Sequence, residues 1–328
     1  MKNYSIKNIM IVFLLVFVSC QPLSTFQIET LKPAPVNFPS NFSKILFVNL
    51  DNDINNDNVI DTLVYKIITK EMHLGLMDGA FNSPNIDSSS FVFTDIFYNK
   101  DQFYTDSAIN WNYLNDLMNK YESDLIIVLD SVVMLMNDMS EANYDVYPVE
   151  FYKFRDFSVT AYWKFVDLYE KSVLDTFVYT DTLYWDLMKT NKKELENEFP
   201  TTVQCLKELS YYTALDYSKR IFPVWKTETR FYYIDGNKQF RLAASLVNEG
   251  KWNEASEIWK QYVKNTDKEL ASRACFNLAV ASEMEGNIEK AVQWAQISFD
   301  IKEKKRTRYY ILKLKNRLSD IDKLKNQV

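Results

Sequence analysis

Glycine, histidine and cysteine are scarce in this sequence, and each shortage excludes a class of functional site. Glycine contributes 5 of 328 residues, well below the usual share of about 7%, so the glycine-rich loops that hold phosphate groups are nearly excluded. A single histidine leaves little material for histidine metal sites or for histidine acid–base catalysis. Basic residues do not dominate either, because 38 Lys and Arg against 44 Asp and Glu give a net charge of −6. That balance does not suit a general nucleic-acid binder.

The rest of the composition is that of a globular protein, with 47% hydrophobic and 25% charged residues. At roughly 100–200 residues per domain, a chain of this length is expected to form two domains. The three cysteines include no CxxC pair, so a zinc site is not expected. Cys205 and Cys275 are predicted to be buried thiols in amphipathic helices. The alternative is a disulfide between them in an oxidising envelope.

The first twenty residues have the organisation of a secretion signal. Lys2 and Lys7 precede ten consecutive apolar residues, 9–18 (IMIVFLLVFV), a segment too short for a membrane-spanning helix of about 20 residues. The small residue Ser19 then stands directly before Cys20, which resembles a bacterial lipobox, although Phe17 occupies the usual leucine position. The resemblance implies cleavage of residues 1–19 and lipidation of Cys20. The alternative is an ordinary signal peptide followed by a chance cysteine.

A lipid-anchored chain is expected in the cell envelope. Gln21 follows the cysteine in place of the aspartate that marks inner-membrane retention in enteric bacteria, which favours the outer membrane. Residues 20–39 contain four prolines, and we expect this segment to be an extended tether between the lipid and the fold.

Residues 40–233 alternate strand-like and helix-like patterns, which predicts a mixed α/β sheet domain. Strands are predicted at 44–50 (KILFVNL), 90–94 and 124–136, and helices at 59–72 and 111–121. Strict alternation over 157–165, followed by 173–185 after a turn, predicts an antiparallel hairpin. Pro200 is expected to open a further helix. KILFVNL, DLIIVLDSV and the hairpin strand FSVTAYWKFVD resemble, in pattern, the α/β domain of the curli-secretion lipoprotein and the amino-terminal domain of the TolB family.

Residues 235–328 contain an internal repeat with a shift of 36 residues. Gly250, Trp252, Ala255 and Trp259 are matched by Gly286, Ile288, Ala291 and Ala295. Small residues let paired helices approach, and glycine ends the first helix of each pair. The segment resembles two tetratricopeptide repeats, whose period is about 34 residues, at 235–267 and 268–303, although the usual closing proline is missing. A third helix at 307–325 is expected to cap the stack.

The end of the chain is basic. Residues 300–328 include ten Lys or Arg and four Asp or Glu, which gives this segment a net charge of +6. One interpretation is a surface for an anionic partner such as lipid headgroups. The favoured interpretation is the solvated face of the capping helix.

Three further features could support chemistry, and each has a simpler explanation. The acidic loop 51–61 (DNDINNDNVID) offers the alternating oxygen ligands that calcium needs, but Asn58 and Val64 replace the required glycine and glutamate. A polar loop that caps the next helix is therefore favoured. No nucleophile elbow accompanies His73, which is expected to be a packed or half-exposed side chain. Gly75 and Gly79 match GxxxG without a surrounding apolar segment. We assign no catalytic, cofactor-binding or metal-binding residue and expect no enzyme activity.

As a whole, the chain resembles a group of lipoproteins common in Bacteroidetes, with a lipobox, an α/β domain and a tetratricopeptide tail. The expected fold class is α+β, a mixed α/β sheet domain followed by an all-α helical tail. The resemblance implies a non-catalytic envelope lipoprotein that acts as an adapter or scaffold, because stacked helix pairs build a concave surface for a protein or peptide partner. Two alternatives are a structural oligomeric subunit of an envelope assembly or secretion complex and a hydrolase of envelope polymers.

Overall fold

The computed structural model describes residues 23–325 and 327, except 38, 40, 51–61, 85–87 and 107. The chain divides into two compact units. The first, here called the sheet unit, comprises Leu31–Trp225 and the last residues Lys323–Val328. The second, the helical unit, comprises the chain up to Thr30 and Lys226–Asp322. A mixed α/β sheet domain followed by an all-helical region confirms the predicted fold class.

The sheet unit is built on a five-stranded mixed sheet with the order β3-β2-β6-β7-β8. Strand β2 (Ile45–Leu50) pairs in parallel with β3 (Phe91–Tyr98) and with the first part of β6 (Leu125–Asn143). Strands β6, β7 (Glu150–Asp167) and β8 (Ser172–Lys189) are antiparallel neighbours. The predicted strands and the predicted hairpin are confirmed, although β6, β7 and β8 are longer than the patterns indicated.

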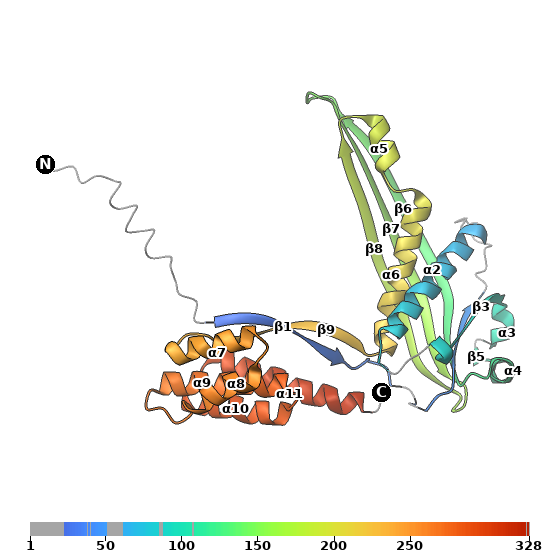
Figure 1. Cartoon of the computed structure of the whole chain (residues 1–328). Helices are drawn as coiled ribbons and strands as arrows, with labels where there is room; N and C mark the ends of the chain where they lie inside the picture. Colours follow the sequence, from blue (N-terminus) through green and yellow to red (C-terminus); the bar gives the residue numbers. More distant parts are fainter. Residues whose placement is uncertain are drawn as a thin grey trace. The chain divides into compact units, whose positions relative to one another are not determined.

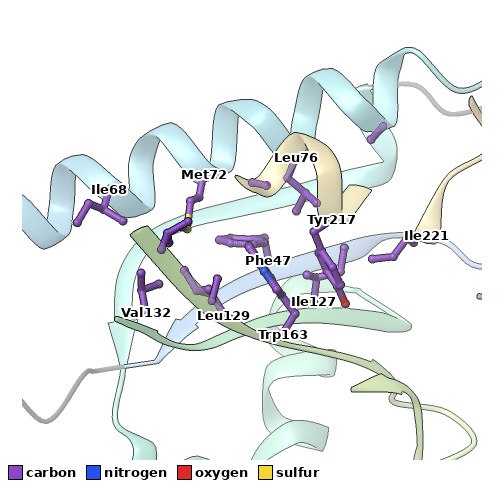
Figure 2. Close-up of a cluster of buried hydrophobic side chains, with 14 of the residues drawn as sticks. Phe47, Ile68, Met72, Leu76, Ile127, Leu129, Val132, Trp163, Tyr217 and Ile221 are labelled. Carbon is purple, nitrogen blue, oxygen red and sulfur yellow. The ribbon is translucent and has the colours of Figure 1, made fainter. Parts of the chain in front are cut away.

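Two long helices cover one face of this sheet. They are α2 (Thr62–Phe81) and α6 (Thr202–Ile221). Figure 2 shows Ile68, Met72 and Leu76 of α2 above the strand residues Phe47, Ile127, Leu129 and Trp163. Tyr217 of α6 stacks on Trp163 with ring centroids 4.5 Å apart. The main core of the sheet unit therefore lies between the sheet and this helix pair.

The glycine pair of α2 allows the two helices to approach closely. A Cβ atom at Gly75 would lie 2.0 Å from the Tyr211 carbonyl oxygen of α6, and one at Gly79 would lie 1.7 Å from the Ser218 Oγ. The GxxxG spacing that had no membrane-helix context thus has a packing function inside this unit.

The other face of the sheet is covered only at one end. There α3 (Lys100–Phe103), the short strands β4 (Tyr104–Thr105) and β5 (Ala108–Ile109), and α4 (Trp111–Tyr121) lie on the sheet. Phe103, Leu114 and Leu117 pack on Val128 and other side chains of β2 and β6 in a second core.

Beyond Leu129, β6 no longer pairs with β2, and the three antiparallel strands continue together. We call this part the arm, formed by residues 131–143, 150–162 and 178–189. Figure 1 shows the arm extending from the rest of the sheet, with α5 (Lys192–Glu198) and α6 on one of its faces.

The helical unit contains five helices in two pairs and a final single helix. They are α7 (Lys238–Asn248), α8 (Trp252–Lys260), α9 (Lys268–Met284), α10 (Ile288–Ile301) and α11 (Lys305–Leu324). Gly250 and Gly286 stand between the helices of each pair with φ of +77° and +79°, a conformation that glycine adopts without strain. The predicted helices and their glycine boundaries are confirmed, and the tetratricopeptide type of the pairs stays a prediction.

A two-stranded ribbon was not predicted. Strand β1 (Leu23–Lys32) pairs with β9 (Val224–Tyr233). The prediction of a tether over residues 20–39 is therefore wrong for Leu23–Lys32, which forms a strand. Most of β9 groups with the helical unit, from Lys226 onward.

Within the described part of the chain, no helix is both long enough and apolar enough to cross a bilayer. Cys205 and Cys275 are buried free thiols, as predicted, and the alternative of a disulfide is not realised.

Candidate interaction surface

One face of the arm lies open in the described structure, and we call it the open face. Register places Val133 of β6, Thr160 of β7 and Thr180 of β8 side by side in one row, and Leu135, Ser158 and Thr182 in the next. The neighbouring side chains in each strand point to the opposite face, where Phe157 and Val159 are buried under the helices. On the open face Val133 is 50% exposed and Leu135 59% exposed.

The centre of the open face is uncharged. Tyr162 and Val178 form a third row beside the two already described. Ser158 and Thr182 are hydrogen-bonded across the strands at 3.0 Å, and Thr160 and Thr180 at 3.3 Å. Hydroxyl pairs and exposed aliphatic side chains thus alternate on a surface that carries no charge over three rows, which is typical of surfaces that bind other proteins.

The two ends of the open face carry charges of opposite sign. Lys164 of β7 and Lys100 of α3 lie at the end nearest the covered part of the sheet and share Asp130 at 3.6 and 3.8 Å, so this end has one more positive than negative charge. Asp156 of β7 and Asp186 of β8 lie beyond the uncharged rows toward the tip of the arm. The surface is therefore electrostatically asymmetric along its length.

A polar cluster marks the boundary between the covered and the open parts of this face. β6 has a register irregularity between Leu129 and Ser131, and Asp130 occupies it. The Tyr104 hydroxyl donates to Asp130 Oδ1 at 2.8 Å and accepts from Lys164 Nζ at 2.5 Å. Burial raises the pKa of Tyr104 well above its usual range, and the hydrogen bond to Asp130 raises it further. The phenol therefore stays protonated and holds the bulge in place.

A cavity lies where β6 begins and β7 ends, and its acidic lining is relevant to the alternative of a hydrolase. Three carboxylates, of Asp124, Asp167 and Glu170, are among its lining residues. Asp124 already accepts hydrogen bonds from the backbone and hydroxyl of Ser43, and Asp167 accepts one from the backbone N–H of Glu170. Asp124 thus ties the segment before β2 to the start of β6, and Asp167 holds the turn after β7.

The inner face of the helical unit is occupied by the chain's own strand β9. The Asn277 side chain of α9 accepts a hydrogen bond from the Tyr233 N–H and donates one to the Tyr233 carbonyl, both at 2.7 Å. Three residues before Tyr233, Arg230 meets Glu283, six residues after Asn277. Three strand residues span about 10 Å and six helical residues about 9 Å. β9 and α9 therefore run antiparallel in matched register.

The contact between Arg230 and Glu283 is the centre of a buried charge network. Arg230 donates to both carboxylate oxygens of Glu283 at 2.8 Å, and the two side chains are 3% and 1% exposed. The Tyr310 hydroxyl and Arg317 Nη1 of α11 donate to the same carboxylate at 2.7 and 2.6 Å. Arg230 also donates to Glu228 at 2.8 Å. A partner peptide cannot use this face of α9 while β9 is bound there.

The candidate residues of the sequence analysis lie partly outside the described residues and partly in the protein core. Cys20 and the acidic loop 51–61 lie outside the described residues. His73 is buried, packs edge-on against Phe47 with ring centroids 4.2 Å apart, and contacts the Asn49 side chain. It is a packed side chain, as predicted. Among the side chains that the structure describes, no group of three His, Cys, Asp or Glu could hold a metal ion.

The open face and the strand bound to α9 were both missed by sequence reasoning. A signal for the open face was present in the aliphatic run 132–136 of β6, because every second residue of a strand must face the side opposite the helices. No comparable signal predicts β9, whose central residues 226–230 are all polar.

Two family models match the chain. A domain of unknown function, DUF8603, matches residues 87–233, and a second, DUF6340, matches residues 241–316. No curated protein matches the chain significantly. Among solved structures, a PelC dodecamer from Paraburkholderia phytofirmans is similar at 8% identity, over 59% of this chain and 94% of that chain, with a TM-score of 0.26. A putative neuraminyllactose-binding hemagglutinin homologue from Helicobacter pylori is similar at 12% identity, over 56% and 88%, with a TM-score of 0.28. The first model spans β3 to β9, and the second spans most of helices α7 to α11.

Proposed function

We propose that the chain is a non-catalytic cell-envelope lipoprotein, anchored through Cys20, that serves as a structural subunit and self-associates through the open face of the arm. The observation that carries this proposal is the set of uncharged rows with Val133, Leu135 and Val178 half exposed. Monomeric soluble proteins rarely leave a contiguous surface of this kind uncovered.

A second copy of the chain fits the open face better than an unrelated partner. Two open faces packed in antiparallel orientation bring the Lys164 end of one copy to the Asp156 and Asp186 end of the other. The uncharged rows then pack on each other, so no unpaired charge is buried at the centre. The arm measures about 40 Å by 14 Å from its strand lengths and spacing. Two such faces bury about 1,100 Å², which exceeds the roughly 1,000 Å² expected of a biological interface and corresponds to a weak, reversible association.

The role of adapter through a groove between the repeats is less well supported than self-association. The α9 face that would bind a peptide is filled by β9, with Asn277 and Glu283 already engaged. In this proposal the helical unit has an internal, structural role, and the arm provides the interaction surface.

Self-association is tested by measuring the oligomeric state of the chain without residues 1–19 and with Cys20→Ser, by analytical ultracentrifugation over a concentration series. We expect a dimer that Leu135→Glu converts to a monomer, because each copy would bury an unpaired carboxylate against the uncharged rows of the other. Leu242→Glu on α7 is the matched control, since Leu242 is 50% exposed and Leu135 59%, and it should stay dimeric. A monomer at every concentration, or the same state for both variants, would contradict the proposal.

The anchor is tested separately on the full chain in a bacterial envelope. Mass spectrometry of the N-terminal peptide should show a lipid-modified Cys20, and Cys20→Ala should abolish that modification and let a high-salt wash release the protein from the membrane fraction. An unmodified cysteine on a membrane-free protein would contradict the lipoprotein assignment without affecting the test of self-association.

A further inference from the structure

We propose that the basic end of the helical unit is a second membrane contact, which binds anionic lipid headgroups beside the lipid anchor. This inference rests on the proposed anchoring at Cys20. The basic end is formed by the start of α11 and the segment before it, with Lys305, Arg306, Arg308 and Lys315; Lys302 and Lys304 in the same segment pair with Glu269 at 2.8 and 2.6 Å.

The charges are concentrated on one element. Helix α11 (Lys305–Leu324) contains seven Lys or Arg and two Asp. Lys313 and Arg317 point into the unit, toward Glu228 and Glu283. Residues 302–308 (KEKKRTR) hold five basic residues and one acid. The positive charge is therefore densest at the start of the helix.

The exposed face of α11 combines these charges with apolar side chains. Lys305, Arg308, Tyr309, Leu312 and Lys315 have the spacing of a single helical face and are all exposed. Tyr309 is 60% exposed and Leu312 54% exposed. The buried residues Tyr310, Ile311 and Leu314 occupy the opposite side. A helix face with basic residues around an exposed tyrosine and leucine is typical of helices that lie in the headgroup region of a bilayer.

The ribbon places this face at the same end of the unit as the anchor. Phe26 of β1 contacts Tyr232 of β9, whereas Thr30 bonds Glu228, so the two strands are antiparallel. The first residues of β1 therefore lie toward the last residues of β9. These last residues also meet the start of α11, since Lys304 Nζ lies 5.0 Å from the Tyr233 ring and the Arg306 guanidinium 4.9 Å from the Phe231 ring.

The anchor cannot be far from this end. Leu23, the first residue of β1, is three residues after Cys20, and three extended residues span at most about 11 Å. A lipid on Cys20 therefore holds this end of the helical unit at the bilayer surface, where each basic residue gains from an anionic leaflet.

The test uses the chain without residues 1–19 and with Cys20→Ser, so that its outcome does not depend on lipidation. We expect it to sediment with vesicles that contain phosphatidylglycerol and not with vesicles of phosphatidylcholine alone. Binding should weaken with added salt, because the attraction is electrostatic. Inorganic phosphate at matched ionic strength should not release the protein, which separates a lipid surface from a site for free phosphate.

The variant that tests the face is Lys305→Glu with Arg308→Glu and Lys315→Glu. It should reduce binding to the anionic vesicles by about tenfold or more. The matched control makes the same charge change in the sheet unit, with Lys171→Glu, Lys192→Glu and Lys193→Glu, and should bind like the parent. Equal binding to both vesicle types, or equal loss in both variants, would overturn the inference. The lipidation of Cys20 and the oligomeric state are measured in separate experiments, so a failure of vesicle binding would not contradict the proposed function.

Discussion

At the scale of single residues, Glu283 has the most consequential contacts, because its carboxylate accepts hydrogen bonds from Arg230, Tyr310 and Arg317. Burial by itself raises the pKa of Glu283, but the bonds from Arg230, Tyr310 and Arg317 outweigh it and hold the pKa below its ordinary value. The carboxylate is therefore charged and fully paired inside the helical unit. Its partners come from β9 and α11, so one side chain joins three elements.

We predict that Glu283→Gln lowers the free energy of unfolding of the helical unit by about 3 kcal/mol, because Arg230 and Arg317 are left without their shared counter-charge. Urea unfolding followed by circular dichroism measures this change. The double variant Arg230→Met with Glu283→Leu removes both charges and should be more stable than Glu283→Gln alone. If the double variant is the less stable of the two, the loss in Glu283→Gln does not come from leaving buried arginine charges unpaired, and the prediction is contradicted.

At the scale of elements, α2 and α6 pack so closely at Gly75 that the contact leaves no room for a side chain. A methyl group there would overlap the Tyr211 carbonyl oxygen, which belongs to the helix backbone and cannot rotate away. The two helices would have to separate over the core that includes Trp163 and Tyr217.

Gly75→Ala should therefore lower the free energy of unfolding of the sheet unit by about 2 kcal/mol or more, despite the better helix propensity of alanine. Gly250→Ala is the comparison, because a Cβ there meets nothing within 4 Å and only the positive φ is unfavourable. It should cost about 1 kcal/mol. Thermal unfolding of both variants checks the order, and a larger loss for Gly250→Ala would show that backbone strain outweighs helix contact.

Elements with a regular hydrophobic period could be predicted from the sequence. Strands whose pairing partner lies far away along the chain could not. The alternation over 157–165 has apolar residues on one side and polar ones on the other, so β7 could be recognised from local sequence. The centre of β9, residues 226–230, is polar, and Lys226 and Thr227 are exposed. It is a strand only because β1 lies beside it, and that pairing joins residues almost 200 positions apart. Local patterns carry no information on such a partner.

The open face shows the same limit at the level of the candidate site. Ser158, Thr160 and Tyr162 correctly indicated the side of β7 opposite the core. The sequence could not tell whether helices α3 and α4 extend far enough to cover that side, because cover depends on tertiary packing. The irregularity at Asp130, which sets the register of Val133 and Leu135, was likewise invisible in the run 124–136.

At the scale of the whole molecule, two units with separate cores should respond differently to acid. In the helical unit, burial opposes ionisation of Glu269, but Lys302, Lys304 and Arg273 lower its pKa to about 2. The pKa of Glu283 in the same unit is also lowered. A carboxylate whose pKa is lower in the folded chain than in the unfolded chain stabilises the fold above the unfolded value. That stability is lost as the pH falls.

We therefore predict that the thermal transition of the helical unit shifts to lower temperature as the pH falls from about 4.5 toward 2. Differential scanning calorimetry at a series of pH values measures the shift. The Glu269→Gln variant should have a lower transition temperature at neutral pH and a smaller dependence on pH in this window. A pH dependence equal to that of the parent would contradict the assignment to Glu269.

The β1–β9 ribbon also dictates an order of events during synthesis. β1 is made near the start of the chain, and the residue that Thr30 bonds in β9 follows 198 positions later. At about 5–20 residues per second, β1 waits about 10–40 s for its partner. All the strands of the five-stranded sheet are translated in that interval, so this sheet can form before the helical unit closes. The segment nearest the proposed lipid is thus the first to leave the ribosome and among the last to find its place. A chain interrupted before residue 224 would keep an unpaired strand beside its anchor.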